Sequence, residues 1–200
     1  LASAYAVVFD QPFPRNWPHH QVPKKDVMVS LSSPSERFAD MVKAHSSRKL
    51  EYDPSQLSVT ELKFVIDHPL TTSELEWARE SESFRRSGFD KIFSSIQYDH
   101  PRLNASVFSW PHGKYSLESI RSKGGICVDQ AYFSSMVGKA KGIPTLTFVG
   151  QGSGGGHAWF GFLKNPGRWE TDCGRYENQN YPVGNAIDPQ LWKQITDDEL

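Results

Sequence analysis

The sequence has few cysteines, no long apolar run and no excess of charge. Cys127 and Cys173 are its two cysteines in 200 residues, so disulfide bonds are not the framework and a hydrophobic core must hold the fold. No apolar stretch approaches the roughly 20 residues that a membrane-spanning helix needs. Lys and Arg number 22 against 23 Asp and Glu, a net charge of −1. This balance argues against nucleic acid as the main partner, because phosphate binding draws on concentrated basic charge.

Motifs for a metal or a cofactor are also missing. The histidines show no spacing such as His-Glu-x-x-His, so we expect no metal site. The glycine-rich residues 150–156 lack the Gly-Lys-Ser/Thr ending of a phosphate-binding loop, and we expect no cofactor. This run is interpreted as a mobile flap or a plain flexible connection in front of His157.

The first part of the chain, residues 1–88, is expected to be an N-terminal region packed on the rest. Five prolines in the first 34 residues favour an extended arm on the surface, with one strand over residues 26–31. Apolar residues at helical spacing then predict helices over residues 35–47, 60–68 and 72–88.

Residues 89–200 are expected to form the functional core. After helical patterns up to residue 121, a longer helix is predicted from Cys127 to a stop at Gly142. The period then changes to that of strands over residues 145–149, 157–163 and 168–172, with a tight turn at Asn-Pro-Gly before the last one. One helix packed on an antiparallel sheet gives an α+β fold.

Cys127 follows a glycine pair at the predicted start of this helix. Free N–H groups and the positive end of the helix dipole favour a thiolate there, so we expect a lowered pKa and a nucleophile. The alternative is a small buried hydrophobic residue. A nucleophile also needs a base from elsewhere in the chain.

His157 and Asp172 are the candidates for that base and for its orienting carboxylate. His157 opens the second strand and Asp172 closes the third, and the turn folds the two strands together, so both side chains are expected at one end of the hairpin. If the helix directs Cys127 to that end, the imidazole can activate the thiol and the carboxylate can orient the imidazole. Cys173 is expected on the opposite face, in a structural role.

Several linked motifs resemble the core of the transglutaminase-like superfamily, which has a papain-like fold. They cover about residues 89–176, and the first 88 residues carry none. The motifs are Ile96-Gln-Tyr98-Asp99, Gly-Gly-Ile-Cys127-Val-Asp-Gln-Ala, Lys141-Gly-Ile-Pro144, His157-Ala-Trp159 and Trp169-Glu-Thr-Asp172. The resemblance implies Cys127 as nucleophile, His157 as general base and then acid, and Asp172 as the orienting residue. Phe160-Gly161 stands where the family often has an acidic residue.

Further residues are assigned to a substrate cleft and to an oxyanion hole. Trp110, Trp159 and Gly156 are the candidates for the cleft, with Trp159 preferred as its wall because it shares a strand face with His157. The backbone N–H of Cys127 is the expected first oxyanion donor. Trp110, His112 and Gln97 are the open candidates for the second.

These residues predict thiol-dependent acyl transfer on an amide of a protein, peptide or glycopeptide, through a thioester. Hydrolysis, as in a cysteine peptidase or amidase, is favoured on the breadth of the family. Transfer to an amine, as in a transglutaminase, and a non-catalytic binding or assembly module remain the alternatives. Residues 196–200 are typical of a helix start, so we expect a piece of a longer protein, whose compartment stays open, secretion included.

Overall fold

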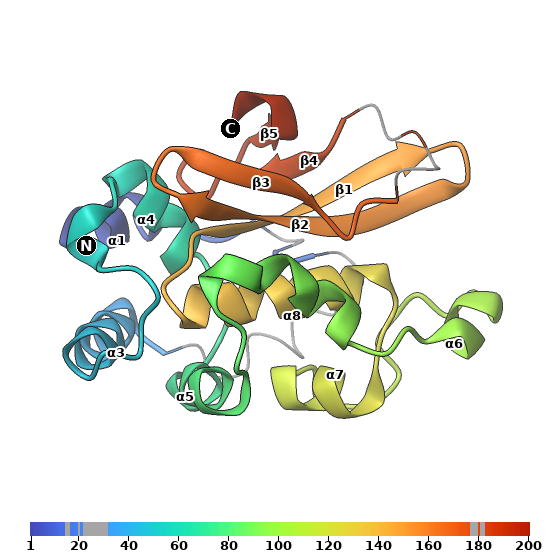
Figure 1. Cartoon of the computed structure of the whole chain (residues 1–200), viewed down its shortest axis with the longest axis horizontal. Coiled ribbons are helices and arrows are strands. Elements are labelled where there is room, and N and C mark those ends of the chain that lie inside the picture. Colours follow the sequence, from blue (N-terminus) through green and yellow to red (C-terminus); the bar gives the residue numbers. More distant parts are fainter. Residues whose placement is uncertain (15–16, 20, 22–31, 177–179, 181–182) are drawn as a thin grey trace.

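The computed structural model describes residues 1–14, 17–19, 21, 32–176, 180 and 183–200. It has an α+β fold with a five-stranded antiparallel sheet in the order β3-β2-β1-β4-β5 (Figure 1). The strands are β1 (Thr145–Gly152), β2 (Gly155–Asn165), β3 (Arg168–Cys173), β4 (Asn185–Ile187) and β5 (Gln194–Thr196). The helices are α1 (Ala2–Val8), α3 (Pro34–Ser46), η1 (Pro54–Gln56), α4 (Val59–Ile66), α5 (Thr72–Ser81), η2 (Arg86–Ser95), α6 (His100–Asn104), α7 (Leu117–Lys123), α8 (Cys127–Ala140) and η4 (Asp197–Glu199).

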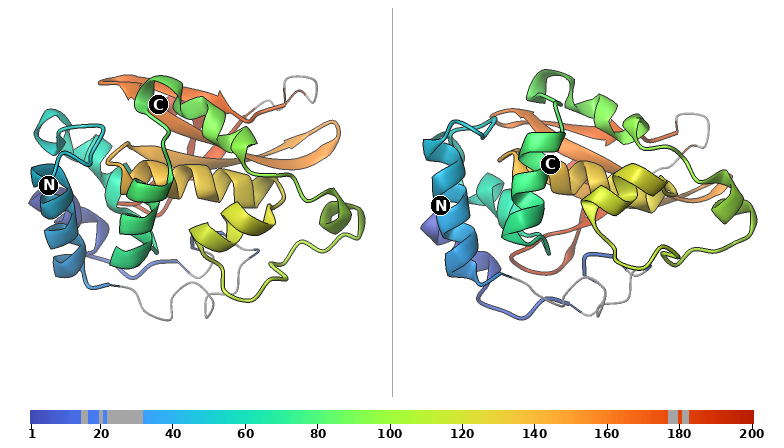
Figure 2. Two further views of the ribbon diagram at one scale, coloured as in Figure 1. Left: turned by 60° about the horizontal axis from the view of Figure 1, so that its bottom comes forward. Right: turned by 90° about the horizontal axis from the view of Figure 1, so that it is seen from below.

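Helix α8 is the centre of the molecule. Every residue of this helix after Cys127 is buried. The sheet covers one side of α8, and α5 and α7 lie on the side away from the sheet (Figures 1 and 2). A helix buried on all sides has no freedom to shift, so the position of its first residue is fixed by the whole core.

The chain enters α8 through a close approach of two backbone segments. Gly124 ends α7 with φ 78° and ψ −170°, a conformation that favours glycine. The N–H of Gly125 then donates to the carbonyl of Gln97 at 3.0 Å, and the N–H of Asp99 donates to the carbonyl of Gly125 at 3.0 Å. A Cβ on Gly124 would lie 2.4 Å from that carbonyl oxygen of Gln97. The glycine pair therefore sets the point at which α8 begins.

The sheet is built on two consecutive hairpins. Strands β1 and β2 pair from Thr145 opposite Phe162 to Gly152 opposite Gly155. The glycine-rich run is therefore the tip of this hairpin, with a two-residue turn, and the interpretation of residues 150–156 as a loop or flap is wrong. Two strands in register satisfy the backbone groups that a flexible loop would leave to water. The turn before β3 at residues 166–167 is confirmed.

The N-terminal part differs from the prediction in several places. The first residues form α1, whose Ala4, Tyr5 and Val8 are buried in the core, so the expected extended arm is wrong there. Apolar packing against the other helices outweighs the absence of a cap or a strong helical pattern in this short segment. Helix α5 ends at Ser81, before the residue 88 predicted. The strand expected over residues 26–31 lies outside the described residues.

Strands β4 and β5 were not predicted, because each is only three residues long and neither shows an alternating pattern. Among the helices that the structure describes, none has the length and apolar character needed to cross a membrane.

Candidate functional site

Cys127 and His157 line the same cavity, which has a volume of about 710 Å³. Cys127 comes from the first residue of α8 and His157 from β2, so the sheet and the central helix bring them together. The cavity lies between these two elements, the end of β1 and the segment at Phe108 and Ser109. This volume is in the range of sites that hold small molecules or a few residues of a peptide.

The thiol of Cys127 is partly accessible, but its pKa is shifted against the expected direction. Burial raises the pKa of Cys127, and the backbone N–H groups of Ala158 and Val128 oppose this rise. The expected lowering at the helix N-terminus is therefore wrong, because the loss of hydration outweighs the stabilising N–H groups. The resting side chain is a thiol, and attack on a carbonyl requires a base.

The ring of His157 is held in one orientation. Its Nε2 lies 2.7 Å from the carbonyl oxygen of Gly174, and the ring stacks on Tyr176 with centroids 3.9 Å apart. A carbonyl oxygen only accepts, so Nε2 carries the proton in this contact and Nδ1 is the basic nitrogen of the neutral ring. Burial lowers the pKa of His157, with the Gly174 carbonyl opposing the shift. The imidazole is therefore a neutral base at pH 7.

Asp172 is not brought to His157. Its side chain is 68% exposed, and its carboxylate accepts from Nη1 of Arg175 at 2.8 Å. The expected meeting at one end of the hairpin is wrong because the turn is centred between residues 166 and 167, with Asn165 opposite Arg168 and Phe160 opposite Cys173. Extending this register places His157 near Tyr176 and leaves Asp172 well short of it. The carbonyl of Gly174 takes the place expected for the carboxylate.

Of the three residues assigned to the cleft, only Gly156 lines the cavity. Trp159 is 0% exposed, and its Nε1 donates to the carbonyl of Thr171 at 2.8 Å, so it is a core residue and not the cleft wall. Trp110 does not line the cavity either and packs edge-on against Tyr115. Two aromatic rings of this size are stabilised more by burial than by exposure in an open cleft, which sequence alternation does not reveal.

The candidates for a second oxyanion donor also lie outside this cavity. Gln97 lines a different pocket, and His112 packs against Trp110. Tyr98 lines the same pocket as Gln97, but its phenol interacts with Cys127: burial raises the pKa of Tyr98 first, and the negative charge that Cys127 would carry as a thiolate raises it further. The phenol therefore stays protonated and is a hydrogen-bond donor beside Cys127.

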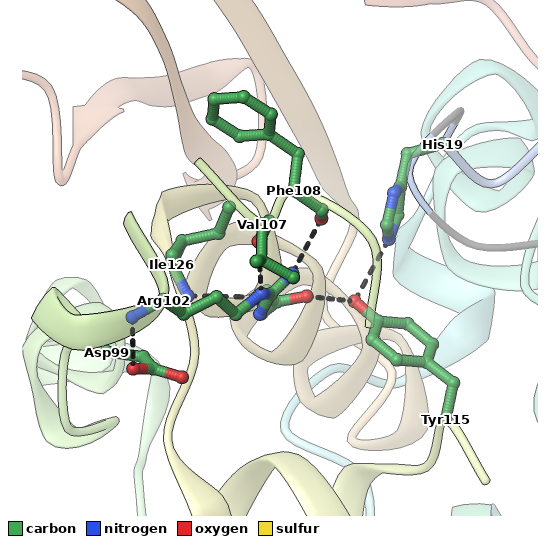
Figure 3. A network of polar contacts seen from close by, with 8 residues as sticks. His19, Asp99, Arg102, Val107, Phe108, Tyr115 and Ile126 are labelled. Carbon is green, nitrogen blue, oxygen red and sulfur yellow. Dashed lines mark hydrogen bonds and ion pairs between the residues drawn. The ribbon is translucent and has the colours of Figure 1, made fainter. Parts of the chain in front are cut away.

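A buried ion pair underlies the start of α8 (Figure 3). Nη1 of Arg102 donates to Oδ2 of Asp129 at 2.5 Å, and both side chains are almost completely buried. The same carboxylate accepts from the N–H of Ile126 at 2.9 Å and from the hydroxyl of Tyr115 at 3.0 Å. Nε2 of His19 lies 2.9 Å from that hydroxyl. Asp129 thus ties the first turn of α8 directly to the segments of Arg102 and Tyr115, and through Tyr115 to His19.

Arg102 and Asp129 were not singled out from the sequence. An acidic residue three positions after the N-cap residue is a recognisable signal of a helix start, and Asp129 stands in that position relative to Ile126. A Cβ on Gly125 would lie 2.4 Å from Cβ of Asp129, which accounts for glycine and aspartate occurring together in the motif. Arg102 carries no comparable signal, because its partner is distant in the sequence.

Cys173 is buried in the core opposite Phe160, as alternation predicts. Within the described ranges, no group of three His, Cys, Asp or Glu side chains is placed to hold a metal ion. Comparison of the sequence with family models and curated proteins, and of the fold with solved structures, gave no match.

Proposed function

We propose that this chain is a thiol-dependent acyl transferase acting on amides, most simply a hydrolase, with Cys127 as nucleophile and His157 as base. One observation carries the proposal: the two side chains line a single cavity from α8 and β2, and the ring of His157 is fixed by Gly174 with Nδ1 as its basic nitrogen. The proposal includes membership of the transglutaminase-like superfamily with its papain-like fold, which rests on the resemblance of the motifs.

The course of the reaction follows from the neutral resting pair. The sulfur of Cys127 bonds to the amide carbon while its proton passes to His157. The C–N bond then breaks, and the imidazolium gives the proton to the departing amine, which leaves a thioester on Cys127. Water attacks the thioester with His157 again taking a proton, the carboxylic acid is released, and the thiol is restored. The backbone N–H groups that stabilise the Cys127 sulfur, those of Ala158, Val128 and Cys127, supply the donors for the oxyanion in this proposal.

Alkylation by iodoacetamide at pH 6 tests the nucleophile. Burial raises the pKa of the Cys127 thiol, so the reaction depends on a base that accepts its proton, and the folded wild type is compared with folded His157→Gln. Cys127 should react at least about tenfold faster in the wild type than in this variant. Cys173 is an internal control, because it is buried and burial also raises its pKa. Equal rates of Cys127 alkylation in the two folded proteins would show that His157 does not activate Cys127.

Whether water or an amine accepts the acyl group from Cys127 is tested with a glutamine-containing peptide, incubated with and without a primary amine. Release of ammonia or cleavage without incorporation supports hydrolysis. Incorporation of the amine shows a transglutaminase-type transfer instead. Normal folding and Cys127 labelling with no turnover on any amide would favour a binding module.

A further inference from the structure

The cavity beside Cys127 is mainly apolar. Its described lining residues include no Asp, Glu, Lys or Arg. Around Cys127 and His157, the apolar part of the lining is formed by Phe108, Val128, Val149 and Ala158. Phe108 is 50% exposed and Val149 is 46% exposed. Large hydrophobic side chains left open at a cavity that also contains a nucleophile indicate a place where an apolar group binds.

The two open apolar residues are held in different ways. Val149 belongs to β1 and stands opposite Ala158 of β2, so the sheet fixes it. Phe108 lies in a segment without helix or strand. Its backbone is held by Arg102, whose Nη2 donates to the Phe108 carbonyl at 2.7 Å and whose Nε donates to the Val107 carbonyl at 2.9 Å.

Figure 3 shows the consequence for the side chain of Phe108. Its carbonyl is directed at Arg102, and its ring points away from the guanidinium. The third hydrogen bond of Arg102 goes to Asp129, two residues after Cys127. A planar guanidinium can satisfy these three acceptors together, whereas a lysine ammonium cannot reproduce the fork. The Phe108 side of the cavity is therefore fixed to the same helix turn as the nucleophile.

We propose that this cavity binds the apolar side chain of a peptide residue whose main-chain carbonyl Cys127 attacks, with Phe108 as the specificity-determining residue. Arg102 is a positioning residue that holds Phe108. The inference rests on the proposed function and adds its substrate class, an extended peptide cleaved after an aliphatic or aromatic residue. An acidic or basic side chain would lose its hydration against Phe108, Val128 and Val149 with no charged partner in the described lining.

The test uses peptidyl fluoromethyl ketones of equal length with Phe, Leu, Gly, Asp or Lys next to the reactive ketone. The rate of Cys127 modification is followed by intact mass and divided by the iodoacetamide rate of the same protein. The Phe and Leu reagents should react at least about tenfold faster than the Asp and Lys reagents, a ratio within the range for apolar pockets. Equal rates for all five reagents would overturn the inference.

Matched variants assign this preference to the cavity. Phe108→Ala should reduce the ratio of Phe to Asp reagent by at least about fivefold, whereas Val107→Ala, the exposed neighbour outside the lining, should leave it unchanged. Gly156→Val is a second variant, since a Cβ there would meet only Oε1 of Gln151 at 3.6 Å. It should slow the Phe reagent more than the Gly reagent. The assignment would be contradicted if Phe108→Ala left the ratio of Phe to Asp reagent unchanged and Gly156→Val left the ratio of Phe to Gly reagent unchanged.

Arg102→Lys separates positioning from a general effect on folding. It keeps a charge near Asp129 but cannot hold both carbonyls, so the concentration of Phe reagent at half-maximal rate should rise about fivefold or more while the maximal rate changes little. An equal loss for Phe and Gly reagents would show that Arg102 has only a structural role. If Cys127 is not activated in the iodoacetamide test, the proposed enzymatic function is wrong. If Cys127 is activated there but reacts equally with all the ketones, only the inference of an apolar substrate residue is wrong.

Discussion

Burial favours the neutral form of the two side chains proposed to react, Cys127 and His157. It raises the pKa of Cys127 and lowers the pKa of His157. A thiol and a neutral imidazole therefore coexist at rest, and in the proposed reaction the proton moves only when the sulfur attacks. This differs from a site that stores a thiolate at a helix N-terminus, because the cost of desolvating the sulfur anion is larger than the stabilisation by the backbone N–H groups of Ala158, Val128 and Cys127.

The direction of each pKa shift predicts the pH profile of Cys127 modification by a peptidyl reagent. A lowered pKa keeps His157 in its basic form to a more acidic pH, so the acidic limb of the profile should lie below pH 6.5. His157→Gln should lose this limb and follow the thiol alone, with a rise only above about pH 9. The rate constants are measured from pH 4.5 to 10 by mass spectrometry. An acidic limb above pH 7 would contradict the structure.

Asp172 and Gly174 give opposite predictions for the orientation of His157. Asp172→Asn should change the modification rate less than about threefold, because this exposed carboxylate pairs with Arg175. Gly174→Ala should lower it at least about tenfold, since Gly174 has φ 89° and a Cβ would lie 2.5 Å from the Phe93 ring, which moves the carbonyl away from Nε2. A large loss in Asp172→Asn with no loss in Gly174→Ala would show that the carboxylate is the orienting group after all.

At the scale of elements, the start of α8 depends on the close contact between the glycine pair at residues 124–125 and the backbone of residues 97–99. The helix is not capped by a serine or threonine; instead Asp129 reaches back to the N–H of Ile126, and the preceding glycines allow residues 97–99 to come close. These contacts fix both the helix axis and the point at which the thiol enters the cavity.

Gly124→Ala should disturb this junction, and Gly113→Ala is its control. Both glycines have a positive φ, 78° and 75°, but a Cβ on Gly124 would lie 2.4 Å from the Gln97 carbonyl while Gly113 has nothing within 4 Å. The free energy of unfolding should fall by about 1 kcal/mol for Gly113→Ala and by about 3 kcal/mol for Gly124→Ala. Urea denaturation measures both, and equal losses would show that the close approach is unimportant.

At the scale of the whole molecule, one hydrophobic core joins the N-terminal helices, α8 and the sheet. His68 is buried within this structure, and neither ring nitrogen has a hydrogen-bond partner among the described residues. Burial, and then the charges of Arg37 and Lys139, lower the pKa of His68 well below its ordinary value. The ring is therefore neutral in the folded protein and gains a proton on unfolding in mild acid.

Acid should destabilise the fold through this residue. Below pH 6.5 the unfolded chain binds a proton at His68 that the folded chain does not, so the free energy of unfolding should fall as the pH falls, with a slope approaching about 1.4 kcal/mol per pH unit. His68→Leu should flatten this slope and leave stability at pH 7.5 equal or higher by about 1 kcal/mol. Denaturant titrations at pH 5.0 and 7.5 compare the two proteins. An unchanged slope in His68→Leu would assign the acid sensitivity to other groups.

The sequence by itself determined the central helix, the two hairpins and the two residues proposed to react. Helical and strand periods, the glycine pair and the Asn-Pro-Gly turn located α8, β1, β2 and β3, and placed Cys127 and His157 where an N-terminus and a strand can meet. These are local signals, because a period or a turn depends on residues that are neighbours in the chain.

Only the tertiary structure decided what surrounds that pair. The hairpin register moved Asp172 away and supplied the carbonyl of Gly174, and core packing buried Trp159. Arg102 fixes Phe108 to the turn of Cys127 through hydrogen bonds across the fold. Register and desolvation depend on contacts between distant segments, and for that physical reason the orienting group, the pKa of the thiol and the apolar cavity could not be derived from spacing alone.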